Sequence, residues 1–496
     1  MKITAMGLKR CGERAVVFLW AVSLAAAASN ARLADASEER DGATIRALLE
    51  QGVDVNAPQV DGMTALHWAA RRDDLELAKA LVRAGADVKA VNRYGVTPLS
   101  LASTNGNAAM VELLLEAGAD PNTALPGGET ALMTAARTGK IGAVKALLFR
   151  GAEVNAKESE HEQTAIMWAA AEGHTEVVET LLAAGADFRT PLESGFTPLL
   201  FAVREGRIGV VRALLKAGVD VNETIQPGRR RSRVRPGTSA LLLAAVNAHF
   251  ELGTILLEAG ADPNADLPGY TVLHVMAPVR NPGVGDNDPP PEGSGNMNSI
   301  EFVKKLAGHG ANLNARMTKQ INLGNTRLNK LGATPFFLAA QSADAELMRT
   351  LAQLGADPLL TSEDDTTPLM AVTGIGTRSP GEDAGTEDEV LEAAQVALDL
   401  GNDINAVDKH GETAMHGAAY KNLPKVVEFL AANGAKIEIW NQKNEFGWTP
   451  LTIADGYRFG NFKPSPPTIE AILGVMAAAG VSAPAIRDPA KSQEIY

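Results

Sequence analysis

One short pattern recurs along almost the whole chain at a nearly constant interval. Its first form is TALHWAA, beginning at Thr64, and in the regular part of the sequence the next copy begins 33 or 34 residues later. The eleven copies begin at Thr64, Thr97, Thr130, Thr164, Thr197, Ser239, Thr271, Thr334, Thr367, Thr413 and Thr449. An interval of this length predicts an elongated array of stacked units and excludes a globule with one central core.

Each copy of the pattern predicts two helices joined by tight turns. The leading Thr is a good N-cap, because its hydroxyl accepts a hydrogen bond from an unpaired backbone N–H. Pro98 illustrates the proline that often follows, at a position where a missing N–H costs nothing. In the second half, apolar residues such as Val177 and Leu181 recur at helical spacing, and a glycine such as Gly185 supplies a left-handed C-cap. The Asp and Asn residues that follow favour a turn into the next copy.

The interval, the caps and the TPLH-like element resemble the ankyrin repeat, and the resemblance covers essentially everything after the first thirty residues. It implies an all-α ankyrin-repeat solenoid of about twelve helix-turn-helix repeats, with β-turn fingers and several loop insertions. Residues 31–56 lack the leading motif but contain LLEQGVDVN, so they are expected to form a twelfth repeat as an N-terminal cap. The resemblance implies a non-catalytic protein whose partners are other proteins, bound on the concave face of the array.

The first 31 residues have the composition of a secretory signal. Four basic residues precede the apolar run Ala15–Ala28, and small residues follow it. We expect cleavage after Ala28 or Ala31, which leaves a periplasmic or extracellular chain with no transmembrane segment. The run of 14 residues is short for a membrane span, but an uncleaved anchor is the alternative. The single cysteine, Cys11, lies within this segment, so the rest of the chain has no cysteine for a disulfide or a zinc site.

The remainder is expected to contain a regular part and an interrupted part. Residues 32–222 keep the interval almost unbroken, whereas residues 223–496 contain long insertions. Two insertions lie between the two helices of a repeat, within Arg280–Ser299 and Gly374–Glu389, and are rich in Pro, Gly and acidic residues. This composition predicts mobile surface loops that a protease would cut first.

Comparison among the repeats argues against several chemical sites. His174 and Glu176 have the spacing of a metal ligand and a general base, but the position of His174 holds Asp74, Lys140 and Arg207 in other repeats. A position that accepts such different side chains is a solvated turn. Gly374 and Gly376 lack the third glycine of a nucleotide-binding loop. Asp286 and Asp288 begin a sequence like a calcium-binding loop, but three prolines interrupt it. His410 and His416 lack an evident third metal ligand. We therefore expect no catalytic residue, no cofactor and no metal.

Two further recurrent positions are interpreted as structural. His67, His274 and His416 occupy the His position of the TPLH element and are expected to make local hydrogen bonds. Trp68 and Trp168 stand where other repeats have Leu or Phe, which favours packing in the core.

Exposed arginines are the candidate partner-binding residues. The last turns of several first helices vary in sequence and face the concavity that the resemblance implies, and there the N-terminal half presents Arg71, Arg72, Arg137 and Arg204. An enlarged finger contains RRRSRVR, which supplies Arg229, Arg230, Arg231, Arg233 and Arg235. These cations predict a protein partner with an acidic face. The formal net charge of −13 makes nucleic acid an unlikely partner.

The arginine-rich finger has other interpretations. It resembles a nuclear-import signal, although an export signal argues against that role, and it is equally compatible with a solvated loop held open by repulsion. The main rival hypothesis for the whole protein is binding of an anionic cell-envelope polymer through Arg229–Arg235. An enzyme assembled from the long insertions is the remaining alternative.

Overall fold

The computed structural model describes residues 31–226, 235–283, 291–320, 326–460 and 463–483. These residues form twelve pairs of antiparallel helices and one additional short helix, which confirms the predicted all-α array of about twelve repeats. The segment 31–56 does form a helix pair, as expected for an N-terminal cap. The chain divides into two compact units, residues 1–219 and residues 220–496, and each is described separately below.

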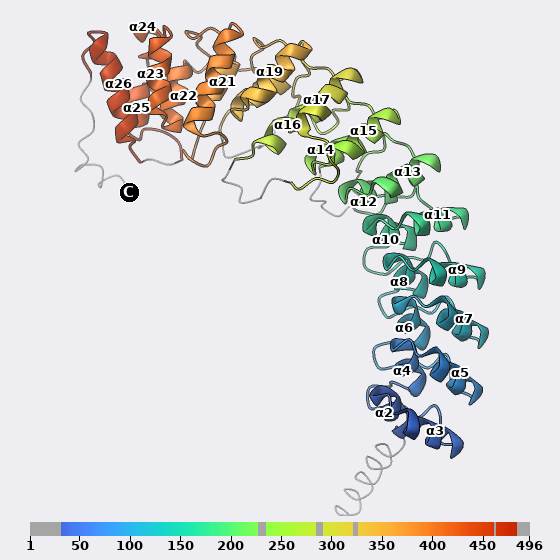
Figure 1. Cartoon of the computed structure of the whole chain (residues 1–496). Helices are drawn as coiled ribbons and strands as arrows, with labels where there is room; N and C mark the ends of the chain where they lie inside the picture. The colour runs from blue at the N-terminus through green and yellow to red at the C-terminus, as the bar shows by residue number, and fades with distance from the viewer. Residues whose placement is uncertain (1–30, 227–234, 284–290, 321–325, 461–462, 484–496) are drawn as a thin grey trace, which may run out of the picture. The chain divides into compact units, whose positions relative to one another are not determined.

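The first unit contains six helix pairs. Their first helices are α2 (Arg32–Glu39), α4 (Ala65–Arg71), α6 (Pro98–Asn105), α8 (Ala131–Arg137), α10 (Ala165–Glu172) and α12 (Pro198–Arg204). Their second helices are α3 (Gly42–Glu50), α5 (Leu75–Arg83), α7 (Ala108–Glu116), α9 (Ile141–Phe149), α11 (Thr175–Ala183) and α13 (Ile208–Lys216). Within this unit each first helix from α2 to α10 packs against the first helix of the next repeat, and the two sets form two layers (Figure 1).

The second unit contains the other six pairs. Their first helices are α14 (Ala240–Val246), α16 (Val272–Arg280), α18 (Pro335–Gln341), α20 (Pro368–Thr373), α22 (Ala414–Lys421) and α25 (Pro450–Ala454). Their second helices are α15 (Phe250–Glu258), α17 (Ser299–Gly308), α19 (Ala345–Leu354), α21 (Glu387–Asp399), α23 (Pro424–Ala432) and α26 (Pro466–Ala478). The short helix α24 (Ile437–Trp440) occupies a finger and has no equivalent among the described residues of the other repeats. No helix among the described residues is both long and apolar enough to cross a membrane.

The capping residues behave as their chemistry predicts. The hydroxyl of Thr97 accepts a hydrogen bond from the backbone N–H of Ser100, and Pro98 is the first residue of α6. The glycine after each second helix has a positive φ, for example 88° at Gly85 and 96° at Gly118, a conformation that glycine adopts without steric cost. Small residues such as Ala69 and Ala102 are fully buried between first helices, so the backbones of successive repeats can approach closely.

A recurrent asparagine joins several of the repeats to the repeat that follows. In the first unit, the side-chain amide of Asn56 donates to the carbonyl oxygen of Gly85 (3.2 Å), and its Oδ1 accepts from the N–H of Asp87 (2.7 Å). The same pair of bonds is made by Asn122, Asn155, Asn222, Asn264 and Asn405. We call these six residues the asparagine ladder. In three other repeats the equivalent residues are Lys89, Arg189 and Leu359, which have no side-chain amide. The guanidinium of Arg189 still donates to the carbonyl oxygen of Gly218 (3.4 Å), but none of the three makes the pair of bonds that the asparagines make.

The insertion after α20 makes contacts with the repeats of the second unit near both of its ends, while residues 378–389 are exposed or half-buried, and its mobility stays a prediction. Thr377 forms an antiparallel bridge with Thr326, and the ammonium of the buried Lys421 donates to the carbonyl oxygen of Ala384 (2.5 Å). Burial lowers the pKa of Lys421 to about 8, and the nearby Asp383 carboxylate opposes that effect. For the Arg280–Ser299 insertion, residues 284–290 lie outside the described part of the chain.

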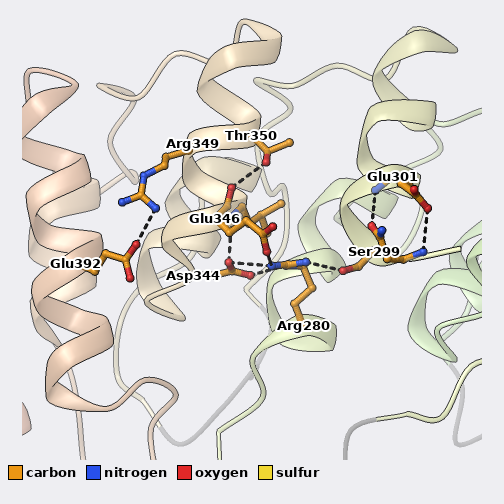
Figure 2. Close-up of polar contacts among 10 residues, drawn as sticks. Arg280, Ser299, Glu301, Asp344, Glu346, Arg349, Thr350 and Glu392 are labelled. Carbon is orange, nitrogen blue, oxygen red and sulfur yellow. Dashed lines mark hydrogen bonds and ion pairs between the residues drawn. The ribbon is translucent and has the colours of Figure 1, made fainter.

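A mostly buried arginine at the end of α16 ties together the helices on either side of the Arg280–Ser299 insertion. Arg280 makes two hydrogen bonds to Asp344, from Nε (2.6 Å) and Nη2 (3.2 Å), and a further one from Nη2 to Glu346 (2.8 Å). Its Nη1 donates to the hydroxyl of Ser299, the first residue of α17 (2.5 Å). Figure 2 shows these contacts joining three helices, α16, α17 and α19. The side chains of Arg280 and Asp344 are 15% and 7% exposed, so this is a largely desolvated ion pair.

Candidate functional site

The predicted arginines of the first unit lie at matching places on its first helices. Arg71, Arg137 and Arg204 are the last residues of α4, α8 and α12, and Arg72 is the C-cap of α4. Cations are favourable at helix C-termini, because the backbone carbonyl groups there carry partial negative charge. Because all four lie at the ends of first helices, they belong to the layer that the first helices form. We call this set of four arginines the arginine face.

Each of these guanidinium groups lies over an aromatic ring. Arg71 and Arg72 are 5.2 and 5.3 Å from the centroid of the Trp68 ring. Arg137 lies 4.7 Å from the Trp168 ring of the following repeat. Arg204 lies 5.1 Å from Phe196 and 5.2 Å from Phe201. A cation over an aromatic face is attracted by the ring quadrupole, so these contacts hold the charges in place while leaving them accessible.

The two tryptophans of this face are not core residues, which corrects the interpretation from sequence. Trp68 and Trp168 are half-buried. Their indole N–H groups donate to Gln59 and to Gln163 respectively, each at 2.7 Å. An amphipathic ring with its polar end satisfied and one face open is a common element of binding surfaces.

Intramolecular ion pairs compete only weakly for these arginines. Arg137 is 3.4 Å from Glu129, and Arg204 is 2.8 Å from Glu205, with the two arginine side chains 47% and 41% exposed. Exposed ion pairs contribute about 0–1 kcal/mol, so an external carboxylate can replace the internal one at little cost. The face can therefore exchange its own acidic partners for those of another molecule.

A shallow hollow marks the N-terminal end of the arginine face. It has a volume of about 680 Å³ and is lined by Glu38, Arg40, Trp68, Arg71, Arg72, Asp73 and Asn105. Asn105 holds the end of α4 by donating to the carbonyl oxygens of Ala70 and Arg71, both at 2.9 Å. Arg72 donates to the carbonyl oxygen of Glu38 at the end of α2. The hollow combines three arginines, two acidic side chains, an indole ring and one amide, a composition suited to a polar protein surface.

The fingers beside this face expose apolar side chains that the sequence analysis did not single out. Val60, Val91 and Tyr94 are 96%, 56% and 64% exposed. Two fingers are joined by the N–H of Arg93, which donates to the carbonyl oxygen of Asp61 (2.8 Å). β-branched and aromatic residues are uncommon in tight turns, and that departure from turn composition was the signal available in the sequence.

The arginine-rich finger belongs to the second unit and lies mostly outside the described residues. Arg229, Arg230, Arg231 and Arg233 are among the residues not described. Arg235 is exposed and lies 6.0 Å from the centroid of the Tyr270 ring. At the base of the finger, Ile225 is buried, and its N–H donates to the carbonyl oxygen of Thr238 (2.9 Å). The anion-binding role of the finger stays a prediction.

The recurrent histidines are built into the repeats. His67 hydrogen-bonds through Nδ1 with the hydroxyl of Thr64 (2.8 Å) and through Nε2 with the carbonyl oxygen of Val96 in the next repeat (3.1 Å). His274 makes the same two kinds of contact, which confirms the predicted hydrogen-bonding role for these two residues. Burial lowers the pKa of His274 to about 4, so its imidazole is neutral at pH 7.

The half-buried His174 is likewise part of the scaffold. Its Nε2 hydrogen-bonds with the carbonyl oxygen of Arg137 in the preceding repeat (2.9 Å). Among the residues that the structure describes, no group of three or more His, Cys, Asp or Glu side chains is arranged to hold a metal ion.

Comparison with known proteins identifies the repeating unit. A family model for ankyrin repeats, described as three copies, matches residues 33–124, 95–158 and 132–225. An ankyrin repeat domain-containing protein, SAT10 of Stachybotrys chartarum, is 32% identical over 225 residues. That match covers 42% of this chain but only 11% of the relative, so the chain spans about a tenth of the relative's length. Residues 33–225 are therefore similar to ankyrin repeats, and the later helices, α14 to α26, include six further helix pairs of the same kind.

Proposed function

We propose that this protein is a non-catalytic scaffold that binds a protein with an acidic face through the arginine face and the adjoining fingers of its first unit. The observation that carries the proposal is the set of Arg–aromatic contacts on α4, α8 and α12. Ankyrin repeats imply protein partners, and these contacts supply both charge and rigid apolar surface for one. Interfaces of this kind gain specificity and association rate from charge complementarity.

The chemistry of the face favours a protein over a simple polyanion. Arginine and aromatic residues are enriched among the residues that dominate binding energy at protein interfaces. Exposed Val60 and Tyr94 add apolar area beside the cations, which a polymer of phosphates or carboxylates would not use. A mixed surface should therefore lose only part of its affinity when salt screens the charges.

We also propose that the protein is exported and acts in the periplasm or outside the cell. The proposal rests on the basic start, the apolar run Ala15–Ala28 and the small residues that follow. N-terminal sequencing of protein isolated from the native host tests it. A new N-terminus near residues 29–32 is the expected result, and an intact Met1 on membrane-bound protein would contradict it.

The binding proposal is tested by charge reversal on two faces. Arg137→Glu with Arg204→Glu replaces attraction by repulsion on the arginine face. Arg83→Glu with Arg212→Glu makes the same change in charge on α5 and α13, the second-helix layer, and is the matched control. Affinity capture from the native envelope fraction, followed by measurement of the affinity of the captured protein, should show binding lost in the first variant and kept in the second.

The outcomes separate the hypotheses. Equal binding by both double variants, with the helical circular dichroism intact, would remove the arginine face from the function. Capture of an anionic polymer that disappears at about 0.5 M salt and requires Arg229–Arg235 would support the polymer hypothesis instead, because purely electrostatic binding is screened at that ionic strength.

A further inference from the structure

The second unit contains a cavity among its fingers that the functions discussed so far do not use. Its volume is about 250 Å³, and it is bounded by four successive fingers, by the loop after α20 and by the loop after α25. The residues that determine its chemistry are Arg327, Asp364, His410, Glu412, Tyr420 and Phe459. Small-molecule sites usually measure about 300–1,000 Å³, so this cavity is closer in size to one long side chain than to a cofactor.

A buried carboxylate at this cavity has one oxygen that accepts no hydrogen bond from any described residue. Glu412 is only 5% exposed. Its Oε1 accepts hydrogen bonds from the hydroxyl of Tyr420 and from the amide of Asn444, both at 2.7 Å. Within the described part of the chain, Oε2 accepts none. Because burial disfavours a charge without a counter-ion, the pKa of the Glu412 carboxyl is raised above its ordinary value.

Two other ionisable side chains at the cavity, Asp408 and His410, already have hydrogen-bond or ion-pair partners. Asp408 accepts hydrogen bonds from the N–H groups of His410 and Glu412 (both 2.9 Å) and thereby holds its finger. His410 lies between two carboxylates, with Nε2 3.1 Å from Asp364 and Nδ1 2.9 Å from Glu445. These contacts raise the pKa of His410 to about 9, with Glu445 the largest contributor. Among the described residues that line the cavity, four carboxyl groups, those of Asp364, Asp408, Glu412 and Glu445, thus outnumber two cationic side chains, His410 and Arg327.

An equivalent residue in the first unit shows what such a carboxylate binds. Glu129 directly precedes Thr130, as Glu412 precedes Thr413, and Glu129 pairs with Arg137 at 3.4 Å. The arginine comes seven residues after the capping Thr130, and the residue seven after Thr413 is Tyr420. In this repeat the guanidinium has been replaced by a phenol, and the carboxylate faces a cavity.

Aromatic rings form the other side of the cavity, and such rings attract planar cations. Phe446, Trp448 and Phe459 form a cluster with ring centroids 4.9–5.2 Å apart. The guanidinium of Arg327 lies 3.6 Å from the centroid of Phe459 at this wall. Phe446 is 39% exposed, so part of the aromatic surface is open to solvent. An arginine or lysine that enters from outside would lay its stem along these rings and carry its charge to the carboxylate.

We infer that this cavity binds one basic side chain, arginine or lysine, of a protein partner, with the cationic head on Oε2 of Glu412 and the stem against Phe446 and Phe459. The inference rests on the proposed role of the protein as a binder of other proteins. It does not depend on the arginine face, because the two surfaces have opposite charge and are built from different repeats.

The test uses capped amino acids as probes with the full chain. N-acetyl-arginine methylamide and N-acetyl-lysine methylamide are titrated by NMR at low ionic strength, and the uncharged citrulline and norleucine derivatives serve as comparison ligands. We expect saturable binding of the two cationic probes and none of the two neutral ones. Equal binding of all four, or of none, would overturn the inference.

Three substitutions locate the binding. Glu412→Gln keeps an acceptor for Tyr420 and Asn444 but removes the charge, so the arginine probe should bind at least about tenfold more weakly. Glu129→Gln makes the same change at the equivalent position, where Arg137 is already present, and should leave binding unchanged. Arg327→Gln removes a like charge from the wall and should tighten binding about two- to fivefold. Thermal melting checks that each variant is folded, and unchanged binding in folded Glu412→Gln would contradict the assignment.

Two further arms identify the source of the cation and separate this inference from the proposed function. If the free amine agmatine binds more tightly than the capped arginine, the occupant is a free amine and the assignment to a protein side chain is wrong. The variant carrying Arg137→Glu and Arg204→Glu should bind the probes normally even if it captures no partner. Loss of probe binding in that variant would show that the two surfaces are not independent.

Discussion

The guanidinium of Arg137 at the end of α8 lies 4.7 Å from the centroid of the Trp168 ring on α10, so a charge from one repeat rests on an aromatic ring of the next. The contact fixes where the charge is presented without burying it. Arginines also lie over Trp68 and over Phe201, in those cases within a single helix, which gives the first unit a series of cations in defined positions.

The first prediction concerns the ring beneath that charge. Trp168→Leu removes the aromatic face and the indole N–H but leaves Arg137 in place. Partner affinity should fall about two- to fivefold, because an exposed cation–π contact contributes about 0.5–1 kcal/mol. Titration of the captured partner against the variant measures the change. An affinity equal to that of the unaltered protein would mean that the position of Arg137 does not depend on the ring.

The second prediction concerns the two arginines of Figure 2. Arg280→Met leaves the carboxylate of Asp344 buried without its cation and should lower the free energy of unfolding of that region by about 3–5 kcal/mol. Arg349→Met removes a pair with Glu392 in which both side chains are about half exposed, and should cost less than about 1 kcal/mol. Urea unfolding followed by circular dichroism compares them. Similar losses in the two variants would contradict the role assigned to burial.

The third prediction concerns pH. His274 is neutral in the folded state with a pKa of about 4, whereas the unfolded chain takes up this proton near pH 6.5. Acid therefore favours the unfolded state, and the stabilisation present above pH 6.5 is lost as the pH falls towards 4. His410 behaves in the opposite way, because its folded pKa is about 9. Its stabilisation is complete below pH 6.5 and is lost as the pH rises through 9.

Thermal melting between pH 4 and pH 9.5 measures both effects. His410→Gln should flatten the alkaline limb and leave the acid limb unchanged, since His274 and the similarly buried His416 remain. An alkaline limb of unchanged slope in that variant would show that the contacts of His410 with Asp364 and Glu445 do not stabilise the fold.

The fourth prediction concerns the asparagine ladder. Asn122→Ala removes two hydrogen bonds to the next repeat and should cost about 1–3 kcal/mol, at about 0.5–1.5 kcal/mol for each bond. Lys89→Asn places an amide at a position where the ladder is interrupted and should raise the melting temperature of the first unit. Lys89→Ala is the matched control, because it removes the same lysine without adding the amide. No difference between the two Lys89 variants would mean that the geometry at that joint does not admit the bonds.

The helices could be predicted from sequence because their ends are encoded locally. Thr97, Pro98 and Gly118 each act within a few residues of their own position, so spacing alone locates them. The ladder was visible only in part: the Asp and Asn residues were recognised as turn formers, and Asp54 does accept a hydrogen bond from the N–H of Asn56 (2.9 Å). The bond from Asn56 to a glycine 29 residues later required the three-dimensional structure.

The candidate sites were predictable to different degrees. The arginine face followed from the repeat register, which aligns Arg71, Arg137 and Arg204 at the ends of equivalent helices. The Arg280 network joins residues 64 positions apart across an insertion of irregular length, so no fixed spacing pointed to it. The cavity at Glu412 could have been predicted from the repeat spacing. An alignment of the finger residues pairs Glu412 with Glu129 and Tyr420 with Arg137. That alignment shows that the arginine is missing in the later repeat.

The asparagine ladder has a consequence for how such a chain can change over evolutionary time. Asn56 reaches a glycine 29 residues later, whereas Asn222 and Asn264 reach theirs after 38 and 46 residues. The extra residues lie within the repeats and leave the joint between neighbours with the same two bonds. Insertions can therefore accumulate in this protein, and diversify what it recognises, without breaking the continuity of the array that carries them.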